Sequence, residues 1–457
     1  MNNKKTPMSV QDAVKRITNF DEVSLGYDDE EAIIEATRCL NCKNAPCIAG
    51  CPVNINIPGF IKKILNHDID GAYHVISETN LLPGICGRVC PQESQCEAVC
   101  VRTKKGEAVA IGRLERYVGD HAKDKKLQIE EKRQDKVAVV GSGPAGLACS
   151  GVLGSLGYEV DVFESLHVAG GVLMYGIPEF RLPKTIVKEE IDNLKAMGIK
   201  FHPNTVIGKS ITIDELFEMG YKAVFVGSGA GLPKFMGIPG ENYNGVFSAN
   251  EFLTRINLMK AYQNDYDTPL KQMKRIAVVG GGNVAMDAAR SAKRLNTEEV
   301  YIIYRRGFSE MPARLEEVEH AKEEGIKFLI LTNPKRIISD ESGYVKGIEC
   351  VEMILGEPDA SGRRSPIVKP NSEFILDVDA VIMALGNYPN PLLASETPQL
   401  KTDKHGCLIV NDQFMTSYPG VFAGGDIVTG AATVILAMGA GKKAANAIHQ
   451  YIQSKKS

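Results

Sequence analysis

The sequence predicts an α/β protein in which two Rossmann-like domains follow an α-helical, cysteine-rich domain. Eight of the eleven cysteines lie between Cys39 and Cys100. Glycine-rich turns begin only after residue 140, and two of them stand between a short apolar strand and a helix. The composition is that of a globular chain, since 44% of the 457 residues are hydrophobic and 24% are charged.

Length and charge indicate the number of domains and the kinds of partner to expect. A chain of 457 residues is expected to form two or three domains. The net charge of −3 predicts no nucleic-acid or anionic-membrane partner. No apolar run approaches the ~20 residues that cross a bilayer, and the N-terminus lacks the apolar core of a secretory signal. We therefore expect a cytoplasmic protein.

The clustered cysteines form two groups, each with a Cys-Pro step. They read C-x2-C-x4-C-x3-C-P from Cys39 to Pro52 and C-x3-C-P-x4-C-x3-C from Cys86 to Cys100. Disulfides are disfavoured in the cytosol, and structural zinc usually takes paired C-x2-C hooks, of which one is present. In ferredoxin-type runs, three close cysteines hold one four-iron cluster and the fourth, before proline, binds another. The pattern favours iron–sulfur clusters, with zinc and disulfides as alternatives.

This comparison also predicts how the ligands are shared between two clusters. The first cluster is expected to take Cys39, Cys42 and Cys47. The second is expected to take Cys51, Cys90, Cys96 and Cys100. The first cluster then lacks one ligand. Cys86 is the thiol candidate, and a carboxylate is the alternative.

The first glycine turn follows the apolar run 136–140 and opens a helix. In the G-x-G-x-x-G pattern the first glycine allows the turn, the second lets the backbone approach a pyrophosphate, and the third lets helix pack on strand. The helix N-terminus then faces the phosphates. The next strand ends in an acid 23 residues after the first glycine, close to the ~20 expected for an acid that binds an unphosphorylated ribose, as in FAD. The predicted contacts are Gly141, Gly143, Pro144, Ala145, Gly146 and Glu164.

The second turn, after the apolar run 275–279, has the pattern G-x-G-x-x-A. The strand that follows its helix ends in two arginines instead of an acid. A guanidinium forks onto a ribose 2′-phosphate, so this site is expected to select NADP(H). The alternative for the arginines is a solvated strand end. The predicted contacts are Gly280, Gly282, Asn283, Ala285, Arg305 and Arg306.

A third glycine-rich turn lies near the C-terminus, where a strand over 420–424 ends in a Gly-Asp step before a long helix. Such a step at a helix N-terminus can hold the ribityl hydroxyls and ring edge of a flavin. A simple β–α turn with a helix cap is the alternative. The predicted contacts are Gly425, Asp426 and Thr433.

Together these motifs resemble two-dinucleotide-domain flavoproteins of the glutamate synthase small-subunit type, over essentially the whole chain. The stretch 19–27 is most similar to the larger, NADPH-binding subunit of NADH-dependent ferredoxin:NADP⁺ oxidoreductase, and the sulfide dehydrogenase subunit is similar. The stretches that carry the resemblance are Cys86–Pro91, Ala110–Glu115, Gly170–Pro178, Tyr304–Arg306, Met311-Pro312 and Phe422–Asp426.

The resemblance implies a domain order and further site residues. Its domains would be a double iron–sulfur domain (1–133), an FAD domain in two parts (134–245 and 379–457) and an inserted NADP(H) domain (246–378). Glu115 would replace the missing thiol and leave Cys86 without a ligand role, with helix packing as the alternative for Glu115. The loop from Gly170 to Arg181, including Gly171, would lie near the flavin. Arg314 would touch the nucleotide phosphate.

The activity so implied is electron transfer between NADP(H), FAD and two [4Fe–4S] clusters, without a nucleophile or an acid–base pair. The expected partners are a second redox subunit and ferredoxin, in a ferredoxin:NADP⁺ oxidoreductase complex that could bifurcate electrons. The alternatives are a glutamate synthase small subunit that feeds a separate large subunit, a sulfide dehydrogenase subunit, and a non-enzymatic sensor or scaffold. The terminal partner and the direction of electron flow are not readable from the sequence.

Overall fold

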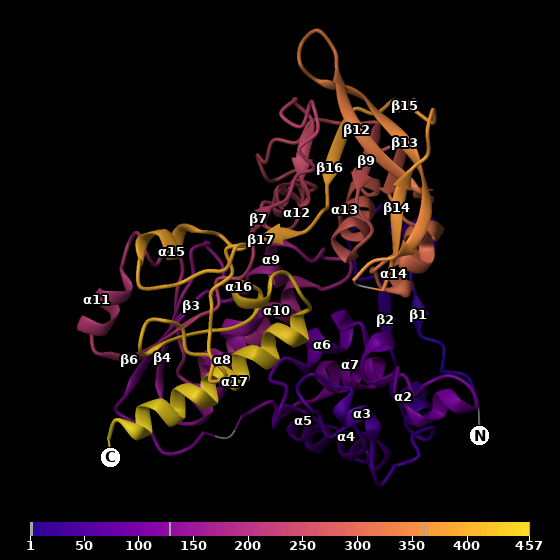
Figure 1. The fold of residues 1–457 in the computed structure, drawn as a ribbon. Coiled ribbons are helices and arrows are strands. Elements are labelled where there is room, and N and C mark those ends of the chain that lie inside the picture. The colour runs from indigo at the N-terminus through magenta and orange to yellow at the C-terminus, as the bar shows by residue number, and fades with distance from the viewer. Residues whose placement is uncertain (1–2, 128, 361, 457) are drawn as a thin grey trace.

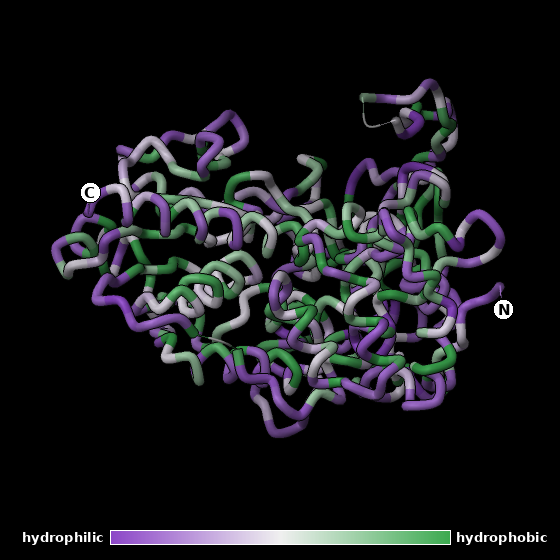
Figure 2. Tube along the Cα trace, turned by 90° about the horizontal axis from the view of Figure 1, so that it is seen from below, coloured by the Kyte–Doolittle hydropathy of each residue, from purple (hydrophilic) through white to green (hydrophobic). Residues whose placement is uncertain are grey.

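A computed structural model describes residues 3–127, 129–360 and 362–456, so Gln128 of the polar linker at 124–136 lies outside the described residues. It confirms the predicted fold class: a helical N-terminal domain is followed by two Rossmann-like domains (Figure 1). Hydrophobic segments concentrate inside the domains, while hydrophilic segments mark the outer turns (Figure 2). Among the described residues, no helix combines the length and apolarity that a membrane span requires.

The N-terminal domain is built from short capped helices around an apolar core. Asp28 and Glu31 form a capping box at the start of α2, and Asn56 caps α4. Phe60 of α4 and Leu114 of α7 are fully buried in the shared core. The elements are β1 (Ser9–Val10), α1 (Ala13–Arg16), β2 (Ser24–Gly26), α2 (Asp29–Ala36), α3 (Pro46–Ala49), α4 (Ile57–Leu65), α5 (Ile69–Ser77), α6 (Pro83–Val89), η1 (Gln92–Ser94), η2 (Val101–Lys104) and α7 (Ile111–His121).

The first Rossmann-like domain has a parallel sheet in the order β18-β6-β3-β4-β5. Its central strands β3 and β6 are largely apolar and buried, as expected where helices cover both faces of a sheet. A Cβ added at Gly441 of α17 would lie 2.1 Å from the carbonyl oxygen of Ala145 of α8, so these helices pack with their backbones in contact. The strands are β3 (Lys136–Val140), β4 (Glu159–Phe163), β5 (Lys200–His202), β6 (Tyr221–Val226) and β18 (Val421–Ala423). The helices are α8 (Pro144–Ser155), α9 (Val172–Tyr175), α10 (Lys184–Ala196), α11 (Ile213–Glu218), α15 (Leu392–Glu396), α16 (Asp426–Thr429) and α17 (Val434–Ser454).

The second Rossmann-like domain has a parallel sheet in the order β11-β10-β9-β16-β8 and carries an antiparallel sheet on one side. The parallel strands are β8 (Val246–Ser248), β9 (Arg275–Val279), β10 (Glu299–Tyr304), β11 (Lys327–Ile330) and β16 (Ala380–Met383). The antiparallel strands are β12 (Thr332–Ser339), β13 (Val345–Pro358), β14 (Arg364–Val368) and β15 (Phe374–Leu376). The helices are α12 (Ala249–Asn257), α13 (Asn283–Lys293) and α14 (Leu315–Glu323), with the short η3 (Phe308–Glu310) between β10 and α14.

The structure differs from the predicted domain limits at one point. The prediction ended the inserted domain at residue 378, but β16 pairs with β8 and β9 and therefore belongs to the second sheet. The chain returns to the first domain only afterwards, through β17 (Asn387–Tyr388), which pairs with the outgoing segment β7 (Leu232–Pro233). Two adjacent segments thus connect the two Rossmann-like domains.

The N-terminal segment also contacts the inserted domain, and β1 and β2 lie beside α14 in Figure 1. The side chain of Arg16 is 1% exposed, and its Nε lies 2.8 Å from Glu324. The Phe20 ring stacks on Tyr262 with centroids 3.9 Å apart. The segment therefore fastens the inserted domain to the helical domain.

Candidate functional site

Four cysteines from separate parts of the helical domain line one small cavity. Cys39 follows α2, Cys42 lies before α3, Cys47 lies in the first turn of α3, and Cys100 lies directly before η2. The remaining walls are largely apolar, with Ile57, Ile61 and Ile111. Burial, together with the neighbouring thiols, raises the pKa of the Cys47 thiol to about 11. Four thiols around one apolar cavity form a ligand set that suits a four-iron cluster.

Three further cysteines and one carboxyl group form a second buried set: Cys51, Cys90, Cys96 and Glu115. Cys51 interacts electrostatically with Glu115 and Cys90, and Cys96 with all three others. Burial raises the pKa of Glu115 to about 8, although Nδ2 of Asn80 donates a hydrogen bond to its Oε1 at 2.6 Å. A metal cluster would give this buried carboxylate the positive charge that it otherwise lacks.

The structure divides the predicted ligands differently from the sequence analysis. Cys100 was assigned to the second cluster and Glu115 to the first, and the two positions are exchanged. The reason is that the chain turns through η1 after Cys90 and carries Cys100 to the cavity of the first group. Each cysteine run therefore sends its last member to the other set, whereas the prediction let only Cys51 cross.

Cys86 lies beside the second set. Its Sγ is 3.7 Å from Oδ1 of Asn80 and 3.5 Å from Sδ of Met438 in α17. Asn80 therefore bonds to both candidates for the last ligand, Cys86 and Glu115. The thiol is already in contact with α17, whereas the carboxylate has only the Asn80 bond, so Glu115 remains the better ligand candidate.

Within the part of the chain that the structure describes, no three histidine, cysteine or acidic side chains converge closely enough for a single metal ion. A four-iron cluster has a wider ligand set, because each ligand binds a different iron atom.

A larger cavity of about 440 Å³ lies where the carboxyl ends of the first sheet's strands face the inserted domain. A Cβ added at Gly143 would meet no atom within 4 Å, whereas one at Gly146 would lie 1.9 Å from the Gly141 carbonyl oxygen. The second glycine thus leaves open space at the N-terminus of α8, and the third permits close packing behind it. Ten predicted contacts line this cavity: Gly141, Gly143, Pro144, Ala145, Glu164, Gly171, Arg181, Asn283, Asp426 and Thr433.

Two acids stand at the ends of strands around this cavity. Glu164 follows β4, and its carboxylate accepts the N–H groups of Ser142 at 3.0 Å and Leu166 at 2.8 Å. Asp426 follows the left-handed Gly425, whose φ is +79°. Burial raises the pKa of Asp426 to about 6, and the Ala432 N–H partly offsets this. Both carboxyl groups are placed as acceptors for hydroxyl groups of a bound nucleotide.

The second glycine turn opens onto the same cavity. A Cβ added at Gly280, where φ is +144°, would lie 2.4 Å from the Ala384 carbonyl oxygen, so a larger residue is excluded. Gly282 has no atom within 4 Å of such a Cβ. Asn283 begins α13 and lines the cavity, and Ala285 is buried behind it. Two helix N-termini therefore face one space, which suits two nucleotides bound in succession.

The arginines after β10 have different surroundings. Arg305 is exposed and has no hydrogen-bond or ion-pair partner within the described residues. Arg306 is buried, and its Nη2 lies 2.6 Å from Oδ2 of Asp359. A buried, paired guanidinium is not free for a phosphate, so Arg305 is the remaining candidate for the 2′-phosphate.

Arg314 extends away from the second glycine turn. Its backbone N–H donates to Oδ1 of Asn283 at 2.9 Å, but its guanidinium donates to the Arg88 carbonyl oxygen at 2.9 Å and to Gln92 at 3.1 Å. In this arrangement Arg314 connects the inserted domain to the helical domain instead of reaching the nucleotide cavity.

The two cofactor regions meet at Cys90. Val89 and Pro91, the residues on either side of it, line the large cavity. The sequence does not predict this contact, because it depends on how the end of α6 packs against the first Rossmann-like domain.

Two family models match the chain. The model described as dihydropyrimidine dehydrogenase domain II, 4Fe–4S cluster, matches residues 16–127, and that of pyridine nucleotide-disulphide oxidoreductase matches residues 120–450. The chain is 36% identical to the glutamate synthase [NADPH] small chain of Escherichia coli, over 96% of this chain and 95% of the relative. It is 39% identical to the NADP(+)-dependent formate dehydrogenase subunit beta of Moorella thermoacetica, over 90% of this chain but 60% of that subunit.

Solved structures share the Rossmann-like part. FprA from Mycobacterium tuberculosis in complex with NADPH superposes with a TM-score of 0.60 at 22% identity, covering 71% of this chain and 86% of FprA. Thioredoxin reductase of T. acidophilum gives a TM-score of 0.51 at 21% identity, covering 70% of this chain and all of that one. These likenesses show the fold.

Proposed function

We propose, from the premise that this chain belongs to the family of glutamate synthase small chains, that its two cysteine sets and its nucleotide cavity form one path for electrons. The chain is an NADP(H)-dependent oxidoreductase with FAD and 4Fe–4S clusters as cofactors. The observation that carries the proposal is that Val89 and Pro91, on either side of Cys90, line the nucleotide cavity. When bound, FAD exchanges electron pairs with NADP(H) and single electrons with the clusters.

The chain's own residues bind and orient these groups. The open space at Gly143 and the N-terminus of α8 would hold the FAD pyrophosphate, and Glu164 its ribose. Asp426, which follows β18 and lines the same cavity, would face the isoalloxazine ring and ribityl chain of FAD. Asn283 at the start of α13 and the unpaired Arg305 would bind NADP(H).

Burial sets the order of the two cysteine sets. The set with Cys90 is buried and adjoins the nucleotide cavity, so it would exchange electrons with the flavin. In the other set, Cys39, Cys42 and Cys47 are only partly buried. The exposed side chains of Leu40 and Val99 lie next to this set in the sequence. Electrons would therefore enter or leave the chain at the Cys39 set.

A second redox subunit would complete the path at that set. We place the chain in a ferredoxin:NADP⁺ oxidoreductase complex that bifurcates electrons, with ferredoxin as the one-electron partner. The alternative is the small subunit of a glutamate synthase, and the 95% coverage of the Escherichia coli small chain favours it. The absence of a recognisable final-substrate site in the sequence agrees with either complex.

Anaerobic purification of the native complex tests this proposal. Flavin content, iron content and the EPR spectrum after NADPH addition would be recorded on one sample. We expect NADPH to bleach the flavin and to produce cluster signals. A flavin that NADPH does not bleach would contradict the electron path. Co-purification of a second flavoprotein would support the bifurcating complex, whereas glutamate formation with a glutamine-dependent large subunit would support the alternative.

A further inference from the structure

A second large cavity, of about 340 Å³, lies where the helical domain, the N-terminal segment and the inserted domain meet. It is formed by residues of β2, α6, α7 and α14 and by the loop at Phe180. Arg181 is the one residue that lines both this cavity and the nucleotide cavity. The cavity is therefore separate from the space onto which both glycine turns open, and no part of the electron path uses it.

The charges on its walls are strongly biased toward arginine. Six arginines and one lysine line it, against five glutamates. The basic residues are Arg88, Arg113, Arg116, Arg181, Arg290, Arg314 and Lys5. The acidic residues are Glu93, Glu97, Glu316, Glu317 and Glu319.

The glutamates on the walls already form ion pairs with basic side chains. Glu317 lies 2.5 Å from Nη1 of Arg290 and 3.2 Å from Nε of Arg181. Glu97 pairs with Lys5, and Glu319 pairs with Lys322, which does not line the cavity. No wall carboxylate is left over to neutralise a further cation within the described residues.

Arg113 is the cation without a carboxylate partner. Its Nη1 donates to the Thr6 carbonyl oxygen at 3.0 Å and to the Tyr27 hydroxyl at 3.4 Å. Its Nε and Nη2 have no hydrogen bond in the described part of the chain, and no ion pair reaches it. In contrast, Arg88 and Arg116 each pair with Glu22 and with Asp120 behind the wall.

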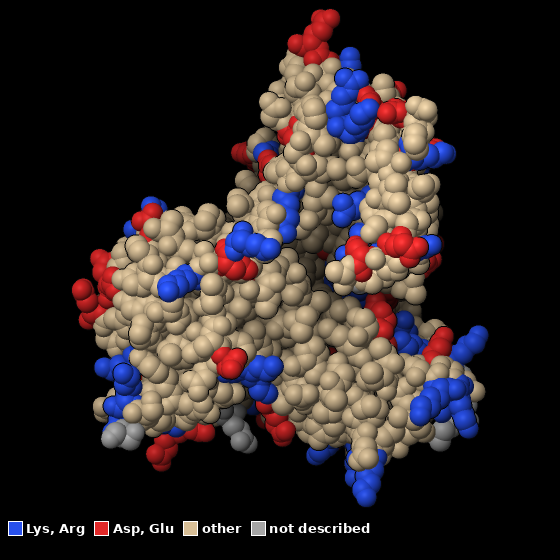
Figure 3. Space-filling model, viewed as in Figure 1, with Lys and Arg blue, Asp and Glu red and all other residues tan. Residues whose placement is uncertain are grey.

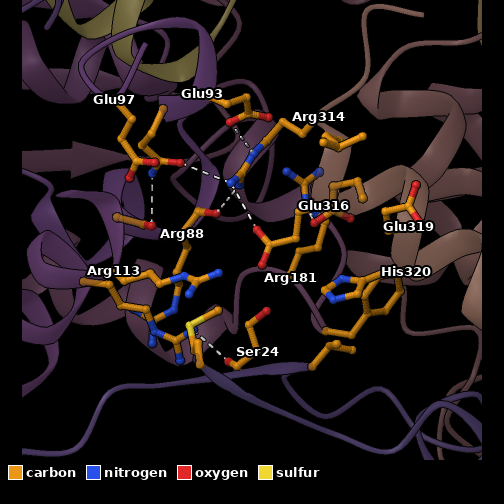
Figure 4. Close-up of a pocket in the computed structure, with 18 of the residues that line it drawn as sticks. Ser24, Arg88, Glu93, Glu97, Arg113, Arg181, Arg314, Glu316, Glu319 and His320 are labelled. Carbon is orange, nitrogen blue, oxygen red and sulfur yellow. Dashed lines mark hydrogen bonds and ion pairs between the residues drawn. The ribbon is translucent and has the colours of Figure 1, made fainter. Parts of the chain in front are cut away.

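Arg314 supplies a second unsatisfied donor. Its side chain is 9% exposed and its Nη2 lies 3.1 Å from Glu316, but its Nε has no hydrogen-bond partner among the described residues and lies 3.5 Å from Glu93. Figure 4 shows Arg113 from α7 and Arg314 from the start of α14 extending into the same space from different sides. Among the described residues, the Nε of Arg314 is buried without a hydrogen-bond partner, while the unbonded Nε and Nη2 of Arg113 belong to a partly buried side chain. An anion between the two guanidinium groups would satisfy these donors.

We propose that this cavity is a binding site for a compact anion with two or more negative charges, of the diphosphate or tricarboxylate class, held by Arg113 and Arg314. Guanidinium groups fork onto both phosphate and carboxylate oxygens, which explains why arginine predominates over lysine on the walls. Because Arg113 belongs to the helical domain and Arg314 to the inserted domain, the bound anion fastens the two together.

Isothermal titration calorimetry of the holoprotein tests the site, with sodium diphosphate and sodium citrate as separate probes at one ionic strength. We expect one site per chain, and a loss of affinity of at least ~10-fold in Arg113→Gln. The matched control is Arg255→Gln, which removes the same charge from a solvent-exposed ion pair on α12 and should bind as the parent does. Saturating NADP⁺ should leave the binding unchanged, because the nucleotide site is separate.

The proposal is overturned if neither probe binds at millimolar concentration, if both variants lose affinity equally, or if NADP⁺ competes. Flavin absorbance and the melting temperature without anion show whether Arg113→Gln is folded. If it is not, Arg113→Lys and Arg314→Gln decide: the first should retain part of the affinity, and the second should lose it. Equal affinity in the parent and Arg314→Gln would also overturn the site.

Discussion

Nη1 of Arg181 lies 2.7 Å and 2.8 Å from the two carboxylate oxygens of Asp287. The arginine belongs to the loop before α10 and the acid to α13, so the pair joins the two Rossmann-like domains at the wall of the nucleotide cavity. Both side chains are almost fully buried. The family resemblance implies that Arg181 lies near the flavin, and the structure shows that its guanidinium is held by an acid of the inserted domain.

Replacing Asp287 with asparagine should destabilise the contact between the domains. Arg181 would keep Glu317 at 3.2 Å but lose its closest counter-charge in a buried position, which typically costs about 3–5 kcal/mol. Urea unfolding of the holoprotein measures the change. The control Asp192→Asn breaks an exposed pair with Lys195 and should shift stability by less than ~1 kcal/mol. Equal losses in the two variants would contradict the prediction.

Glu115 and Cys86 should differ in their effect on iron content. If Glu115 completes the buried set, Glu115→Ala should lower the iron from about eight atoms per chain to about four. Cys86→Ser should leave the iron unchanged, because its thiol lies beside the set, where it contacts Asn80, Met438 and Cys90, and is not the expected ligand. Iron analysis and EPR after anaerobic purification measure both. Iron loss in Cys86→Ser alone would reverse the assignment.

Substitutions of Arg305 and Arg306 should also have different effects, one on NADPH binding and the other on stability. Arg305→Gln removes the unpaired guanidinium and should weaken NADPH binding by ~10–100-fold, with little effect on NADH, which lacks the 2′-phosphate. Arg306→Gln should instead lower stability, since it breaks the buried pair with Asp359. Stopped-flow reduction of the flavin by each nucleotide, together with thermal unfolding, distinguishes them. A similar change for NADH and NADPH in Arg305→Gln would exclude phosphate recognition.

Glu190 should make stability depend on pH. Burial raises its pKa to about 7 from an ordinary 4.5, although the Gly84 N–H bonds to it at 3.1 Å. The folded chain therefore holds a proton that the unfolded chain releases, and this group's contribution to stability is lost as pH rises from 4.5 to 7. The loss is up to about 3 kcal/mol.

The variant Glu190→Gln tests this relation. Its amide oxygen can still accept the Gly84 N–H, but the group no longer titrates. The variant should match the parent near pH 5 and exceed it in stability at pH 8, as measured by urea unfolding across that range. Glu189→Gln, at the exposed neighbouring position, should follow the parent at every pH. A parent that gained stability with rising pH through this group would contradict the sign.

Local sequence predicted the fold because each strand and turn carries its own signal. The run at 137–140 is apolar throughout, as a buried parallel strand requires, and the glycines at 141 and 280 occupy left-handed positions that the turns demand. The C-terminal limit of the inserted domain was predicted wrongly because the apolar sequence of β16 would suit a buried strand of either parallel sheet. Its neighbours are decided by tertiary packing.

The candidate site was predictable as a set of residues but not as an arrangement. Cysteine spacing predicted the candidate ligands, yet the exchange of Cys100 and Glu115 between the two sets depends on the turn at η1, which spacing does not encode. Likewise, the two adjacent arginines that follow β10 differ in exposure, since Arg306 is buried against Asp359 and Arg305 is exposed, and this difference depends on tertiary packing. The anion cavity has no linear signal, since its walls come from segments some 300 residues apart.

The insertion also fixes when the flavin site can form during synthesis. Strands β3 to β6 emerge early, but β18 pairs with β6 and α17 packs on α8 only after the whole inserted domain has been made. During synthesis, the helical domain and the inserted domain can therefore fold before the FAD domain, whose first part lacks β18 and α17 until the end of the chain has been made. The sheet of the FAD domain, begun by the strands between residues 136 and 226, is therefore completed only when β18 has been synthesised.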